Sequence, residues 1–297
     1  MISKIFIIGP GGILCYSKDF FSKVDKDDEI VSGYITAVSD FAREIKGGKI
    51  ESLIFKNFKL VYSYSIEFNC IFVIVIDKDD LEDIARKNLE LMKSEFINRY
   101  RPYLEKWTGL VNIFSDFDNY IEENIYIPPE ILLTGEKGVG KTTIMKFLPG
   151  EMILELDDNF NEIIQKTVKI NDLKGIKECI IRSINLDNLV NHSDLYKEYL
   201  NSIDIICIIT NSGASNLGRT KRLFSLLVDK VHTSNFYVLA NFQDEEDAVL
   251  DKDQISDMFG LKTYSFSAVE ANAKEYFLLI IKEMLRVSIS DKLNFES

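Results

Sequence analysis

Residues 135–142 read Gly-Glu-Lys-Gly-Val-Gly-Lys-Thr. This is the spacing of a phosphate-binding loop, in which a glycine is followed by four residues and then by Gly-Lys-Thr. Glycines allow the tight bend that brings several backbone N–H groups onto phosphate oxygens, the lysine reaches the outer phosphates, and the threonine hydroxyl ligates Mg²⁺. The predicted metal ligand is Thr142, and the predicted phosphate site comprises Gly135, Glu136, Lys137, Gly138, Val139, Gly140, Lys141, Thr142 and Thr143.

The residues around this loop agree with that interpretation. Residues 131–134 are an apolar run typical of a buried strand, and 143–148 begin a helix whose N-terminus would face the anion. From residue 130 onward strands and helices alternate, which predicts an α/β domain with a mostly parallel sheet and helices on both faces. A turn at 171–175 is expected to join strands 163–170 and 178–184 as a hairpin. Further strands are expected at 204–210, 235–241 and 261–266, and helices at 141–148, 193–201, 217–232 and 269–286.

The first 125 residues have the pattern of a small α+β domain. A Gly-Pro-Gly-Gly turn at 9–12 is followed by neither a helix nor a Lys-Ser/Thr pair, so we interpret it as a hairpin turn. Apolar residues recur at helical spacing between Ile30 and Ile45, and the alternation within 58–66 predicts a strand with one solvated face. The expected order is strands 4–8 and 13–16, helix 30–45, strands 50–55, 58–66 and 69–76, and helices 79–100 and 114–125.

Two adjacent prolines, Pro128 and Pro129, interrupt both helix and strand patterns. They predict a linker at 126–129 between a domain of residues 1–125 and a domain of residues 130–297. A length of 297 residues is sufficient for two hydrophobic cores.

The composition narrows the classes of partner. A formal net charge of −12 argues against broad nucleic-acid binding, because a phosphate backbone requires a basic surface. The apolar runs are too short for a transmembrane segment, and the ends carry no signal peptide or lipidation motif, so we expect membrane recruitment only through a partner. Two histidines exclude a multi-histidine metal site, and four cysteines in apolar runs predict buried free thiols in a reducing cytoplasm.

Base recognition is expected after the later strands, because ligands bind at the carboxyl ends of parallel strands. A carboxylate at Asp244 would accept from N1–H and the exocyclic amine of guanine, while Asn241 would brace the phosphate loop or the base. Residues Ser267 and Ala268 follow the next strand, where the Ala268 N–H would contact the guanine carbonyl oxygen. The pattern Asn-x-x-Asp alone is also common in polar turns. Its position directly after a strand is what favours its interpretation as a guanine-binding motif.

Residues 130–286 resemble a small GTPase, closest to the Arf and Arf-like branch of the Ras superfamily. The resemblance rests on the phosphate loop, on Leu-Tyr-Lys-Glu-Tyr at 195–199, on Ala-Asn-Phe-Gln-Asp at 240–244 and on Ser267-Ala268. The hairpin in the sheet also separates Ras-like domains from most kinases. This resemblance implies binding of GTP or GDP with Mg²⁺, and loops that change conformation on hydrolysis.

Residues 1–125 resemble the longin/roadblock superfamily, on the order of their elements and the Gly-Pro-Gly-Gly turn. That resemblance implies contacts with other proteins, often small GTPases, without catalysis. It leaves open a dimer formed through this domain. Together the two resemblances imply a regulator in vesicle trafficking or membrane-associated signalling, located in the cytoplasm or peripherally at membranes.

The chain departs from the small-GTPase pattern at several positions. Phe242 replaces the family lysine between Asn241 and Asp244. After the third strand the family has Asp-x-Gly-Gly-Gln, and here the Mg²⁺-linked aspartate, the second glycine and the glutamine are replaced by Asn185, Asn188 and Leu189. A leucine cannot orient an attacking water, so the sequence predicts very slow hydrolysis.

Two residues could compensate for these losses. Asp187 could supply a shifted carboxylate and His192 a group that orients water, although a histidine on a solvated loop is the simpler interpretation. The first switch is equally degenerate: 155–166 is acidic, and Asp157 and Asp158 lie where the family has a threonine.

Two functional hypotheses remain. The first is a GTP-binding regulator with impaired hydrolysis, and the second is a pseudo-GTPase scaffold that acts through protein surfaces. An ATP-dependent phosphotransferase would need lid arginines, and Arg182, Arg219 and Arg222 follow no lid pattern.

Overall fold

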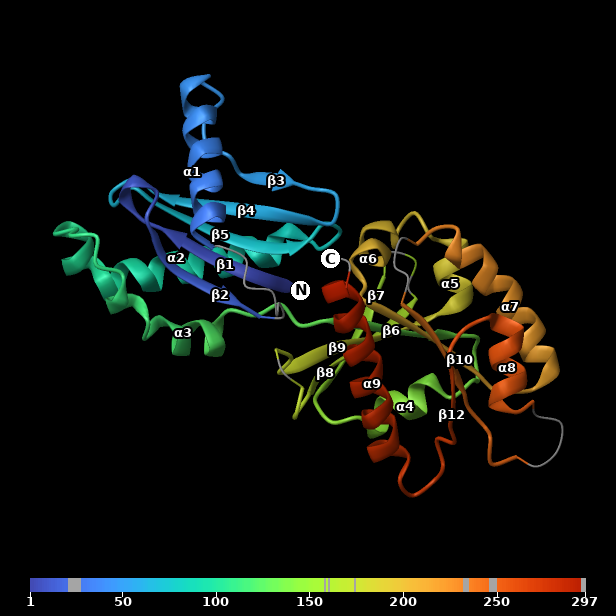
Figure 1. Ribbon diagram of the computed structural model, residues 1–297. Helices are drawn as coiled ribbons and strands as arrows, with labels where there is room; N and C mark the ends of the chain where they lie inside the picture. Colours follow the sequence, from blue (N-terminus) through green and yellow to red (C-terminus); the bar gives the residue numbers. More distant parts are fainter. Residues whose placement is uncertain are drawn as a thin grey trace. The chain divides into compact units, whose positions relative to one another are not determined.

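The computed structural model describes residues 1–20, 28–157, 159, 161–173, 175–231, 235–245 and 250–294. Asp158 of the expected first switch and His232 lie outside these residues. The chain divides into two compact units, Met1–Ile127 and Pro128–Ser297, so the division falls inside the predicted linker. Figure 1 shows the helices and strands of each unit.

The first unit has an antiparallel five-stranded sheet with strand order β2-β1-β5-β4-β3. Its central strand buries side chains on both faces, because helices from different parts of the unit cover each side. The elements are β1 (Ile2–Ile8), η1 (Pro10–Gly12), β2 (Leu14–Asp19), α1 (Asp28–Glu44), β3 (Ser52–Ile54), β4 (Phe58–Ser65), β5 (Cys70–Asp77), α2 (Glu82–Glu105), η2 (Asn112–Phe114) and α3 (Phe117–Asn124).

In the first unit one predicted helix is confirmed but buries a different side from its apolar stripe, and the solvated face predicted for one strand is wrong. The helix predicted from 30–45 forms as α1, but it packs through Ser32, Ile35 and Ser39, so that Ile30 and Phe41 of the apolar stripe are 70% and 61% exposed. Strand β4 has no solvated face, because α2 covers the side that the alternation assigns to water. In both cases the apolar period correctly predicts the type of element, but it does not predict which face of that element is buried.

The second unit is an α/β domain with a seven-stranded, mostly parallel sheet in the order β12-β11-β10-β6-β9-β8-β7. Strand β6 lies between β10 and β9 and is parallel to both. The predicted hairpin is confirmed, since β8 pairs antiparallel with β9. The strands are β6 (Glu130–Gly135), β7 (Met152–Leu156), β8 (Glu162–Lys169), β9 (Glu178–Asn185), β10 (Ile205–Thr210), β11 (Phe236–Ala240) and β12 (Thr263–Ser265).

Helices cover both faces of this sheet. Alternate residues of β10, Ile206 and Ile208, pack with α5, α6 and α7, while α4 and α9 pack together through the rings of Phe147 and Phe277. Strand β7 and helix α8 are absent from the sequence-based prediction, although Asp251 and Gln254 form a capping box that marks the start of α8. The helices are α4 (Lys141–Phe147), α5 (Leu186–Asn191), α6 (Lys197–Ser202), α7 (Ala214–Val228), α8 (Lys252–Phe259) and α9 (Ala273–Asn294).

The parallel strands place several loops at one edge of the sheet. Gly135 at the end of β6 is in register with Asn185 at the end of β9, and Thr210 of β10 is in register with Ala240 of β11. The carboxyl ends of these strands are the position at which open α/β sheets bind ligands. The predicted site residues therefore come from loops that meet at this edge.

Candidate functional site

The loop between β6 and α4 follows a path that requires glycine at both ends. Gly135 has φ +157°, and a Cβ atom there would lie 2.3 Å from the carbonyl oxygen of Ile209 on the neighbouring strand. Gly140 has φ +96°, and its Cβ would lie 2.3 Å from Nδ2 of Asn241. Real Cβ atoms do not approach other atoms so closely, so a side chain at either position would displace the loop. Above Gly138, by contrast, the space for a Cβ is open.

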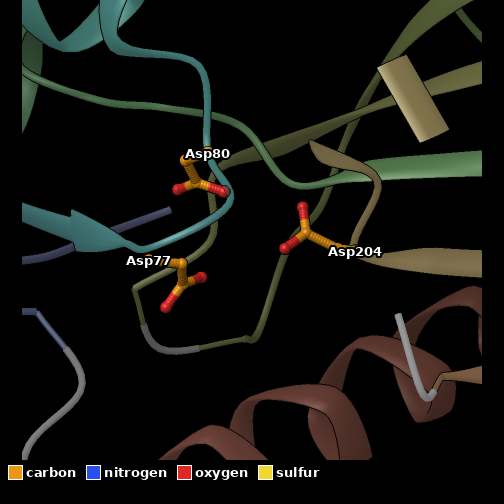
Figure 2. A group of neighbouring side chains, drawn as sticks. All are labelled: Asp77, Asp80 and Asp204. Atoms are coloured by element: carbon orange, nitrogen blue, oxygen red, sulfur yellow. The ribbon is translucent and has the colours of Figure 1, made fainter. Parts of the chain in front are cut away.

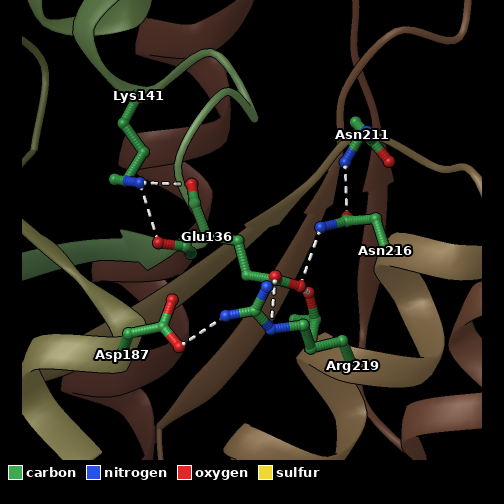
Figure 3. A network of polar contacts seen from close by, with 8 residues as sticks. Glu136, Lys141, Asp187, Asn211, Asn216 and Arg219 are labelled. Atoms are coloured by element: carbon green, nitrogen blue, oxygen red, sulfur yellow. Dashed lines mark hydrogen bonds and ion pairs between the residues drawn. The ribbon is translucent and has the colours of Figure 1, made fainter.

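Lys141 is the first residue of α4 and is almost fully buried. Its ammonium group donates hydrogen bonds to the carbonyl oxygens of Gly135 at 2.7 Å and Glu136 at 2.6 Å (Figure 3). Burial lowers the pKa of Lys141 to about 8, although the nearby carboxylates of Asp187 and Glu136 act in the opposite direction. Because an ammonium group has three donors, one N–H remains for a phosphate oxygen.

The residues that follow Lys141 are open to solvent. Thr142 and Thr143 are exposed in the first turn of α4, where backbone N–H groups have no partner within the helix. Within the described part of the chain no group bonds the Thr142 hydroxyl. A phosphate could accept hydrogen bonds from these N–H groups, and a hydrated Mg²⁺ could be bound by the Thr142 hydroxyl.

Asn241 connects three parts of the site. Its side chain is buried after β11, where Nδ2 donates to the carbonyl oxygen of Val139 at 3.0 Å and Oδ1 accepts from the N–H of Ala268 at 3.0 Å. Asn241 thus braces the phosphate loop, as the sequence suggests. The Ala268 N–H, expected to contact guanine, donates to Asn241 instead, and the buried Ser267 hydroxyl has no partner among the described residues.

The loop that carries Asp244 is held in a defined shape. Gln243 donates from its backbone N–H to Phe266 and from Nε2 to Leu250, and Phe242 adopts a left-handed φ of 67°. Asp244 is exposed and has no hydrogen bond or ion pair to another described residue. Its carboxylate is thus available to accept from a ligand.

Glu136 is the centre of a polar network that the sequence analysis missed. Its carboxylate is buried, where Oε1 accepts from Asn216 and Thr220 at 2.9 Å each and Oε2 pairs with Nε of Arg219 at 3.0 Å. Figure 3 shows Arg219 reaching from α7 between Glu136 and Asp187, and its Nη2 lies 2.9 Å from Oδ1 of Asp187. The signal in the sequence is a polar face on α7, where three of these residues recur at i, i+3 and i+4.

The segment after β9 forms helix α5 and not an open loop. Leu189 is completely buried in the core with Leu186 and Val190, so a glutamine there would not face a bound nucleotide. Asp187 contributes to the electrostatic environment of Lys141 and is linked to the loop through Arg219. His192 is exposed at the end of α5, and no described contact connects it with the loop.

The acidic stretch expected to form the first switch contributes β7 and β8, which pair as an antiparallel hairpin. Asp157 closes the turn by accepting from the N–H groups of Asn159 and Asn161, from Nδ2 of Asn161 and from the Tyr196 hydroxyl. Slight burial raises the pKa of Asp157, but the bonds from Tyr196 and Asn161 outweigh it and lower the pKa to about 2. Asp157 is therefore a turn-closing carboxylate.

Three further aspartates, drawn in Figure 2, have structural partners within their own units. Asp77 and Asp80 follow β5 of the first unit and pair with the N-terminal ammonium of Met1. Asp204 precedes β10 of the second unit and accepts from the Glu130 N–H at 2.9 Å. We assign no ligand to them.

No protein-family model matches the chain, and no curated protein is significantly similar to it. Among the described helices none is both long and apolar enough to cross a bilayer.

Proposed function

We propose that this chain is a guanine-nucleotide-binding regulatory protein of the small-GTPase type. The proposal rests above all on one observation: the glycine-bounded loop between β6 and α4 is braced by Asn241, which also bonds the loop that contains Ala268. A single buried side chain thereby couples the predicted phosphate site to the predicted base site. A phosphate loop that served only as a turn would not require this connection.

The pocket would hold its ligand through three groups of contacts. Backbone N–H groups of the loop, together with the third N–H of Lys141, would bind phosphates, and the Thr142 hydroxyl would ligate Mg²⁺. The exposed carboxylate of Asp244 would select guanine. When bound, Mg²⁺ would offset the negative charge of the phosphates.

Hydrolysis by this protein should be very slow. In small GTPases a positioned side chain orients the attacking water, and the corresponding Leu189 is buried in the core. The first-switch segment is a hairpin closed by Asp157. We therefore assign the protein a role in which the bound nucleotide controls protein contacts, in trafficking or membrane-associated signalling, with the longin-like first unit as the partner-binding module.

One observation favours the second hypothesis, a pseudo-GTPase scaffold. Lys141 is already bonded to two carbonyl oxygens of its own loop, and Glu136 next to it is fully hydrogen-bonded. The polar side chains of Glu136 and Lys141 thus have partners within the protein itself. In this hypothesis the same architecture would serve only as a rigid surface for other proteins.

The test is to denature the purified full-length protein, identify any released nucleotide by HPLC, and titrate nucleotide-free protein with GDP, GTP, ADP and ATP in the presence of Mg²⁺. We expect guanine nucleotides to bind at one site, and Lys141→Ala to weaken them by at least about tenfold, because a charge-assisted bond is lost. Lys146→Ala is the matched control, since Lys146 is exposed in the same helix. Asp244→Asn should shift the preference from GDP towards xanthosine diphosphate. Absence of released nucleotide, combined with no heat on titration, would favour the scaffold.

A further inference from the structure

The guanidinium of Arg219 joins the phosphate loop to the first turn of helix α5 at the carboxyl edge of the sheet. Nε pairs with Glu136, the second residue of the phosphate loop, and Nη2 pairs with Asp187, two residues beyond the end of β9. Strands β6 and β9 are neighbours, so the loop that carries Glu136 and the helix turn that carries Asp187 follow adjacent strands (Figure 3). The Arg219 side chain is nevertheless 63% exposed.

The two ion pairs of Arg219 differ in how readily they can exchange. Glu136 is buried, and both of its carboxylate oxygens are engaged, one by Asn216 and Thr220 and the other by Arg219. Asp187 has a side chain that is 33% exposed, and only its Oδ1 has a partner among the described residues. The pair with Glu136 is therefore a fixed anchor, whereas the pair with Asp187 is open to competition.

A terminal phosphate would be a strong competitor for that guanidinium. Arginine has five N–H donors in a planar fork that matches phosphate oxygens, and the ion pairs with Glu136 and Asp187 occupy only part of them. Phosphate carries more charge than the single carboxylate of Asp187. Asp187 follows Asn185, which is in register with Gly135 at the start of the phosphate loop, so Asp187 lies at the same edge of the sheet as that loop.

The geometry points to Arg219 as a residue that recognises the terminal phosphate of the nucleotide, held in place by Glu136 and released from Asp187 when a triphosphate binds. This inference rests on the proposed function and assigns a role to a residue outside the phosphate-loop and guanine-recognition motifs. It predicts that the protein distinguishes triphosphate from diphosphate through an ion pair that exchanges its partner. Arg219 would bind phosphate and Asp187 would be its competitor.

The test measures affinities of GDP and of the non-hydrolysable analogue GppNHp by calorimetry on full-length protein, first in EDTA and then with Mg²⁺. Arg219→Ala should weaken GppNHp by about tenfold, the usual effect of losing one bond to a charged group, and leave GDP within about twofold. Asp187→Asn should tighten GppNHp in EDTA, because the competing carboxylate is removed. Arg222→Ala is the matched control, since Arg222 is exposed on the same helix and makes no described ion pair.

The outcomes separate this inference from the proposed function. If wild-type protein binds neither ligand, both are overturned. If it binds them and Arg219→Ala changes GDP and GppNHp equally, or changes neither, only the role of Arg219 is overturned. Weaker GppNHp binding by Asp187→Asn in EDTA would also overturn it, because Asp187 would then support the ligand. Circular dichroism of each variant establishes that it is folded.

Discussion

Replacing Asn241 by alanine tests whether the site is held together as described. Asn241 is 1% exposed, and its side chain makes two hydrogen bonds, to the carbonyl oxygen of Val139 and from the N–H of Ala268, each 3.0 Å long. The substitution leaves one acceptor and one donor without a partner, at a cost of about 1–3 kcal/mol each. We therefore expect the second unit to lose about 3 kcal/mol of its free energy of unfolding.

Urea titration of the full-length protein measures this loss with a probe for each unit. Trp107 is the only tryptophan and packs against the core of the first unit, so its fluorescence reports on that unit, whereas circular dichroism reports on both. With a urea dependence of about 2 kcal/mol per molar, a loss of 3 kcal/mol lowers the midpoint of the second unit by about 1.5 M. The Trp107 transition should stay where it is.

The control is Asn191→Ala, because Asn191 is an exposed asparagine at the end of α5 in the same unit. It should move neither transition by more than about 0.3 M, since exposed substitutions are usually near neutral. A shift for Asn241→Ala as small as that of the control would refute the bracing role. An equal shift of the Trp107 signal would refute the assignment of the effect to the second unit.

Three further predictions concern the same unit. The pKa of Lys141 is about 8 in the free protein, and a bound phosphate favours its charged form. GDP affinity should therefore be nearly constant between about pH 7 and 8, where the nucleotide phosphates are ionised, and fall by up to about tenfold per pH unit above pH 8. Calorimetry across this range should show no such slope for Lys141→Ala. Leu189→Gln should lower the free energy of unfolding, measured by thermal unfolding, by about 3 kcal/mol, because it buries an amide, and it should not restore GTP turnover. The control Leu195→Gln, at a leucine that is 52% exposed, should lower this free energy by less than about 0.5 kcal/mol. Gly135→Ala should destabilise the second unit and abolish nucleotide binding, because its Cβ would clash with a backbone carbonyl. The control Gly218→Ala lies in the interior of α7 with open space around its Cβ, and it should stabilise the second unit by up to about 1 kcal/mol.

The features predicted correctly from the sequence depend on residues close together in the chain. The strand, glycine loop and helix around 135–142 form as expected, as does the hairpin of β8 and β9, because a local apolar period and turn residues specify each of them. The chain also divides at Ile127 and Pro128, where two prolines interrupt the pattern. Periodicity and backbone chemistry were sufficient for these elements.

The features that could not be predicted depend on which distant segments come together. The period of α1 specifies a helix, yet Ile30 and Phe41 are exposed, because the sheet packs against the opposite side of that helix. Leu189, which the resemblance places where small GTPases have a glutamine, is buried in a core to which α6 and α7 contribute. Glu136 meets Thr220 from 84 positions away, and Arg219 then reaches Asp187. The apolar period of a segment depends only on that segment's own residues. The burial and ion pairs of its side chains depend on distant segments that folding brings next to them.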